Sequence, residues 1–248
     1  MGRLWKLRYQ SCRLVDLEQQ VLGFEREGDV PGDLIPYIYF EYLRTQLAAR
    51  LLPVFHHNAL DILTLACLTA IVPEAFRCLE PDAQRATRGL GRHAAEMVGL
   101  GRWLRGAGEL EQAAALFQEA IDAGLGEELL YPTLWDLAAL ERKRDRTERA
   151  LQLWEELSTA PSAFRVKAII ERAKHYEHRA KDPERALELT REAFLHPVSG
   201  RDVEELKRRE QRLEKRLERL KRQAEKESGK EQAAKITSKP GKSAAAAR

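Results

Sequence analysis

The stretch GRWLRGAGELEQAAALFQEAI, residues 101–121, reads as two amphipathic helical segments separated by a polar turn. Related stretches follow at residues 138–157 and 173–193. Each of the three stretches begins with a small residue, which is followed by a polar turn and a second small residue. The second small residue follows the first by 12 positions in the first two stretches and by 13 in the third. The repeat period is 37 and then 36 residues. A recurring helix-turn-helix unit with small residues at the helix contacts is therefore predicted.

A bulky residue or its substitute stands four places after the second small residue, at Phe117, Trp154 and Thr190. This pattern resembles tetratricopeptide repeats with a somewhat long period. The resemblance implies a helical solenoid over residues 83–197, whose groove could hold a peptide or protein partner. Three units are the minimum for a stack that supports itself, and the third departs from the pattern at Thr190.

The composition favours helix throughout, since charged residues make up 33% of the 248 residues and aromatic residues 7%. The expected fold class is mainly α. Net charge is +3 overall, but residues from 201 onward carry 16 basic and 9 acidic side chains, a surplus of 7. Three cysteines form no paired framework, and no secretory signal is visible, so a cytoplasmic location without a membrane span is expected.

The carboxy-terminal segment divides into two parts. Residues 201–227 hold apolar side chains at alternating steps of three and four, which predicts a charged helix with a heptad seam interrupted by Glu210. Residues 228–248 are rich in Lys, Ala, Ser and Gly, and disorder is expected there. As a charged helix with a weak leucine seam, this segment fits self-association or solvation. With its basic surplus it could also hold phosphate backbones without sequence preference.

The amino-terminal zone, residues 1–79, contains the polar group His56-His57-Asn58 before the apolar run that follows Asp61. In one interpretation a helix begins near Asn58, which caps it, while Asp61 faces its positive end. In the other, His57 and Asp61 stand one turn apart on one face and take part in catalysis. Local sequence alone favours the cap.

The surrounding sequence supports the catalytic interpretation. Residues 11–68 resemble the C-terminal half of the YprB-type ribonuclease H-like exonuclease family. The matches, in order, are Cys12-Arg13-Leu14, Val21-Leu22-Gly23, Asp29-Val30-Pro31-Gly32, Ile35-Pro36, Tyr39-Phe40, Tyr42-Leu43-Arg44, His57-Asn58 and Asp61-Ile62-Leu63. The resemblance implies that Asp61 binds a divalent metal, Mg²⁺ or Mn²⁺, that His57, or else His56, is the base, and that the substrate is nucleic acid.

The family's first motif, a D-x-E on a strand, is missing from this sequence. The string with Asp16 and Glu18 sits at a later place in the family pattern. A two-metal site needs about four carboxylates, so we expect an amino-terminally shortened exonuclease relative that is inactive alone. Its helices at residues 36–48 and 58–72 should then expose apolar faces. The alternative function is a non-catalytic interaction scaffold built from the repeats, with oligomeric state open.

Overall fold

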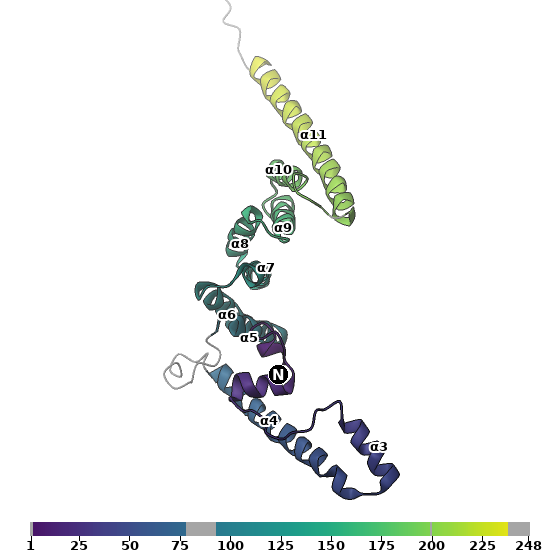
Figure 1. The fold of residues 1–248 in the computed structure, drawn as a ribbon. Coiled ribbons are helices and arrows are strands. Elements are labelled where there is room, and N and C mark those ends of the chain that lie inside the picture. The colour runs from purple at the N-terminus through teal and green to yellow at the C-terminus, as the bar shows by residue number, and fades with distance from the viewer. Residues whose placement is uncertain (1, 78–92, 199, 238–248) are drawn as a thin grey trace, which may run out of the picture. The chain divides into compact units, whose positions relative to one another are not determined.

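The computed structural model describes residues 2–77, 93–198 and 200–237, and it is mainly helical with no strand in those ranges (Figure 1). The predicted fold class is therefore confirmed. The chain divides into two compact units, Met1–Arg144 and Asp145–Arg248. The predicted boundary between residues 79 and 83, and the expected disorder at residues 238–248, lie outside the described residues.

The first unit begins with short elements. These are α1 (Gly2–Trp5), α2 (Leu14–Leu17), the π-helical turn η1 (Glu18–Leu22), α3 (Ile35–Thr45) and the 3-10 turn η2 (Ala48–Leu51). Residues 14–22 are thus helical. Gly23 ends η1 with a φ of 64°, a left-handed conformation that glycine adopts without steric cost. The chain is thereby turned into the loop that carries Arg26 and Asp29.

Helix α4 (Leu52–Arg77) is much longer than the sequence suggested. Pro53 lies in its first turn, where a missing backbone N–H costs nothing, and Pro73 lies inside the helix. Asn58 is consequently in the helix interior, and the interpretation of Asn58 as the helix cap is wrong. His57 and Asp61 project one turn apart from a continuous helix.

The first unit is completed by α5 (Ala94–Ala107), α6 (Leu110–Asp122) and α7 (Glu127–Lys143). Helix α5 packs against α6 and against α1, and α6 packs against α7. A Cβ added at Gly101 would lie 2.6 Å from Phe117 Cε1, so the predicted close approach at this small residue is confirmed. The helix pairs follow the expected order, while their assignment to the tetratricopeptide type stays a prediction.

The second unit contains α8 (Thr147–Thr159), α9 (Arg165–His178), α10 (Pro183–Ala193) and α11 (Gly200–Thr237). Its core joins Ile169 and Ala173 of α9, Leu189 and Ala193 of α10, and Leu206 of α11. Leu213 is also fully buried, beside α10. Two leucines of the heptad seam are therefore used within the unit, and α10 lies beside α11 (Figure 1). Helix α11 continues past Ser228, where the composition suggested disorder.

Helices α3 and α4 expose an unusual amount of apolar surface, as the sequence predicted. The side chains more than 60% exposed on these helices are Tyr37, Phe40, Leu52, Phe55, Ile62 and Leu63. The stretch Ala48–Glu74 is also long and apolar enough to cross a bilayer by length and composition, and core helices of soluble proteins share these two properties. Exposed apolar surface of this kind is typical of interaction sites.

Candidate functional site

The candidate site is built around Arg26, in the loop that follows η1. Its guanidinium forms a two-pronged ion pair with Glu18, the first residue of η1: Nε donates to Oε2 at 2.7 Å and Nη2 to Oε1 at 2.6 Å. The Arg26 side chain is 5% exposed and that of Glu18 is fully buried. Removing either charge would leave the other buried without its partner, so this pair fixes the loop.

Arg26 also binds two further carboxylates. Nη1 donates to Asp29 Oδ2 at 2.8 Å and Nη2 donates to Asp61 Oδ1 at 2.6 Å. Thr64, one turn after Asp61 on α4, donates its hydroxyl to Glu18. One cation thus holds three carboxylates together and ties η1 and the loop to the middle of α4.

His57 is oriented by the same cluster. Its Nδ1 lies 2.8 Å from Asp29 Oδ2 and 3.0 Å from Oδ1, and its Nε2 lies 3.5 Å from Asp61 Oδ2. Arg26 Nη1 is also 3.4 Å from Nδ1, but two donors cannot bond each other, and the contacts with Asp29 are shorter. Nδ1 is therefore the donor to Asp29, and Nε2 faces Asp61.

The electrostatics of the cluster follow from these contacts. The hydrogen bond from Arg26 is the main cause that lowers the pKa of Glu18, against the opposing effect of burial. Burial acts most strongly on Asp29 and raises its pKa, but the hydrogen bonds from Arg26, His57 and the Val30 N–H together outweigh it, so the pKa of Asp29 is lowered. The hydrogen bond to Glu18 raises the pKa of Arg26 above its already high ordinary value. The three groups are therefore held in their charged forms.

The structure brings together two of the three predicted site residues. His57 and Asp61 meet in the cluster, whereas His56 is exposed and has no hydrogen bond to it among the described residues. Sequence reasoning gave no role to Glu18, Arg26, Asp29 or Thr64. Asp29 had a signal, because it begins the Asp-Val-Pro-Gly stretch of the family pattern. Arg26 had none, since an isolated arginine in a loop has no characteristic spacing.

The cluster as it stands does not fit a metal ion. Both oxygens of Glu18 and of Asp29 accept hydrogen bonds from protein donors, as does Oδ1 of Asp61. In residues 2–77, 93–198 and 200–237 no group of three or more His, Cys, Asp or Glu side chains is arranged to hold a metal. Asp61, with 34% of its side chain exposed, has one oxygen to offer. A divalent ion here would need carboxylates from outside the described residues.

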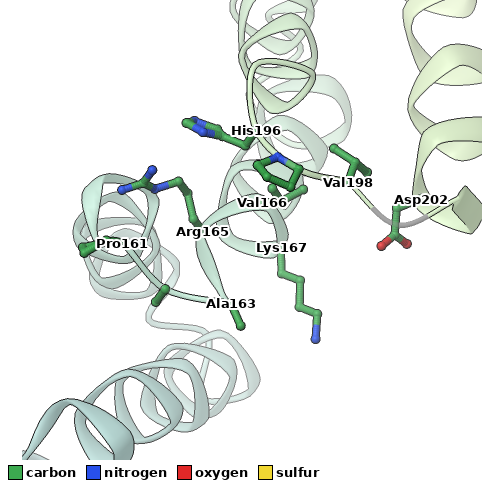
Figure 2. A pocket seen from close by; sticks show the side chains of 10 residues that line it. Pro161, Ala163, Arg165, Val166, Lys167, His196, Val198 and Asp202 are labelled. Atoms are coloured by element: carbon green, nitrogen blue, oxygen red, sulfur yellow. The ribbon is translucent and has the colours of Figure 1, made fainter.

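The second unit contains a cavity of about 790 Å³ formed by the α8–α9 turn and the start of α11. Figure 2 shows that the charged ends of two of its cationic side chains, Arg165 and Lys167, point in different directions. Arg165 is already used, since its Nε donates to the Ala160 carbonyl at 2.8 Å and its Nη2 to the Thr159 carbonyl at 2.8 Å at the end of α8. The charged ends of these two side chains therefore do not converge on a common ligand position in the cavity.

The chain is similar in sequence to one protein family and to one curated protein. Residues 1–72, which contain the whole Arg26 cluster, match the RNase_H superfamily. The chain is 30% identical over 214 residues to the uncharacterized protein YprB of Bacillus subtilis (strain 168), an alignment that covers 85% of this chain and 49% of the relative. The chain thus spans about half the length of the curated relative it matches. No solved structure matches.

Proposed function

We propose that this chain supplies one corner of a ribonuclease H-like 3′–5′ exonuclease site that acts on nucleic acid. Asp61 contributes one ligand to a divalent metal, Mg²⁺ or Mn²⁺, and His57 is the base. The observation that carries the proposal is the placement of His57 between two carboxylates, with Asp29 on Nδ1 and Asp61 opposite Nε2. The match of residues 1–72 to the RNase_H superfamily supports nucleic acid as the substrate class.

The chemistry that this chain can perform is proton abstraction. An ionised Asp29 accepts a hydrogen bond from Nδ1–H, which keeps the lone pair of His57 on Nε2. The same carboxylate stabilises the imidazolium that forms when Nε2 takes a proton. Water that approaches through the exposed side of Asp61 would meet Nε2. Arg26 is a positioning residue in this scheme, because it holds Asp29 and Asp61 on opposite sides of the imidazole.

We further propose that cleavage needs carboxylates from polypeptide that covers the apolar face of α3 and α4. One available carboxylate oxygen at Asp61 is too few to hold a catalytic metal against water. The same helices expose Phe40, Phe55 and Ile62, which a covering segment would bury. The chain alone is then inactive, and one covering polypeptide would both complete the domain and supply the missing ligands.

The experiment is degradation of a labelled single-stranded oligonucleotide in Mn²⁺, by the chain alone and mixed with the part of the Bacillus subtilis relative that the alignment leaves out. The mixture is expected to shorten the oligonucleotide and the chain alone is not. Asp61→Ala and His57→Ala should abolish the activity, and the matched control His56→Ala should retain it. Activity that survives both Asp61→Ala and His57→Ala would refute the proposal.

A further inference from the structure

One face of α11 carries a continuous row of cations outside the candidate site. Arg208, Arg212, Lys215, Arg219, Arg222 and Lys226 follow one another at steps of four and three residues. At 3.6 residues per turn and 1.5 Å per residue, this row lies along one face over about 27 Å. The acidic residues within the same span, Glu210, Glu214, Glu218 and Glu225, fall at other positions around the helix. The face is therefore basic without interruption.

The side chains of this face enclose a groove of about 580 Å³. Its lining residues are Arg208, Gln211, Arg212, Lys215, Arg216 and Arg219, five cations and one amide. Arg208, Lys215 and Arg219 are exposed, and within the described part of the chain none of them pairs with a carboxylate. These three charges are available to a ligand.

Helix α11 is fixed on its unit by contacts between the base of this groove and Glu177 of α9. Glu177 of α9, 3% exposed, accepts a hydrogen bond from Arg212 Nε at 2.8 Å and lies 3.7 Å from Arg209 Nη1. Arg216 Nη1 donates to the Glu177 backbone carbonyl at 3.4 Å. The buried carboxylate thus anchors the base of the groove and sets how the helix is rotated.

The acidic side of α11 is neutralised by its neighbour. Arg191 of α10 donates to Glu210 at 2.9 Å and to Glu214 at 2.6 Å. Leu206 and Leu213 are buried against the same unit. The helix therefore buries Leu206 and Leu213 and pairs Glu210 and Glu214 with Arg191. Arg208, Lys215 and Arg219 are left exposed to solvent.

We propose that this basic face of α11 binds the phosphate backbone of nucleic acid without sequence preference. The three exposed cations Arg208, Lys215 and Arg219 are free to neutralise phosphates and release counterions, which is the main source of non-specific affinity. The groove contains no large apolar side chain that could insert into a lipid surface, which argues against a membrane. The proposal concerns binding alone and needs neither a metal nor His57 and Asp61, so it stands or falls independently of the exonuclease proposal.

The test is fluorescence anisotropy of a labelled single-stranded oligonucleotide with the full chain, in a chelator, over a series of salt concentrations. The test variant is Lys215→Glu with Arg219→Glu, and the matched control is Lys207→Glu with Lys221→Glu, which lowers the net charge by the same amount on other faces of α11. The test variant should weaken binding more than about tenfold and reduce the slope of log affinity against log salt by about 2. The control should keep the wild-type slope, and oligonucleotides of different sequence should bind alike.

Two results would overturn the proposal. If both double variants lose affinity equally, the effect is one of net charge and the face has no role. If the wild-type chain binds anionic lipid vesicles but no oligonucleotide, the face is a membrane surface.

Discussion

Arg26 Nη2 lies 2.6 Å from Asp61 Oδ1, a contact that joins residues 35 positions apart and draws the loop after η1 onto α4. The same guanidinium satisfies the fully buried Glu18. The cluster is therefore both the structural link of the amino-terminal elements and the frame that holds His57 between two acids.

Arg26→Met should destabilise the first unit by about 3–5 kcal/mol, because Glu18 would keep a buried charge without its cation. Hydrogen exchange of α4 amides, followed by mass spectrometry, should speed up. Adding Glu18→Gln to Arg26→Met should restore part of the protection, since the unpaired charge is then gone. Unchanged exchange in the single variant would show that the ion pair does not hold α4.

The first unit should lose stability in acid. The pKa of Glu18 and that of Asp29 are lowered on folding, so the unfolded chain binds more protons than the folded chain. Their contribution is fully present above the unfolded pKa values, about 4.3 for Glu and 3.9 for Asp, and is lost as pH falls through the lower folded values. The free energy of unfolding, measured with urea between pH 2 and pH 6, should fall less steeply with decreasing pH in Asp29→Asn than in the wild type. Asp33 is exposed in the same loop, and Asp33→Asn should keep the wild-type pH dependence.

Gly101→Ala should destabilise the α5–α6 pair by about 1–3 kcal/mol, because the added Cβ meets the Phe117 ring at 2.6 Å. Gly106→Ala, in the same helix, is the matched control: a Cβ there meets nothing within 4 Å, and alanine should stabilise the helix by about 0.5–1 kcal/mol. Thermal unfolding of both variants provides the comparison. A stabilised Gly101→Ala would show that the two helices do not approach as described.

The apolar face of α3 and α4 should make the chain self-associate. Ile62 and Phe40 are 68% and 67% exposed, so Ile62→Lys with Phe40→Lys should reduce association and the binding of a hydrophobic dye without loss of helix. Leu68→Lys, on the same helix but 1% exposed, should instead unfold the region. Analytical ultracentrifugation and circular dichroism separate the two outcomes. If the double variant still self-associates, the self-association surface lies elsewhere.

The sequence predicted what depends on local pattern. Helical periodicity and the small residues gave the helix pairs, including the contact between Gly101 and Phe117. The prediction of where α4 begins was wrong. The local sequence around Asn58 is compatible with both a helix cap and a helix interior, and the choice depends on the packing of residues before Asn58. The resemblance to a family pattern pointed to His57 and Asp61, which the structure brings into the Arg26 cluster. Arg26 was out of reach, because its role comes from a fold that brings Glu18, Asp29 and Asp61 to one guanidinium.

Helix α11 shows a second limit. The heptad seam of residues 201–227 is compatible with self-association, but Leu206 and Leu213 pack inside the second unit. A repeat of apolar residues shows which face is buried and says nothing about whether the partner is another chain or the same one.

The most direct test is the tautomer of His57, read from long-range ¹H–¹⁵N correlations of the uniformly labelled chain at pH 9. The assignment comes from the signals that His57→Gln removes. The contact with Asp29 predicts that Nδ1 carries the proton and Nε2 is free, and that Asp29→Asn shifts the population toward the Nε2-protonated form. A wild-type His57 protonated on Nε2, unaltered by Asp29→Asn, would contradict the account.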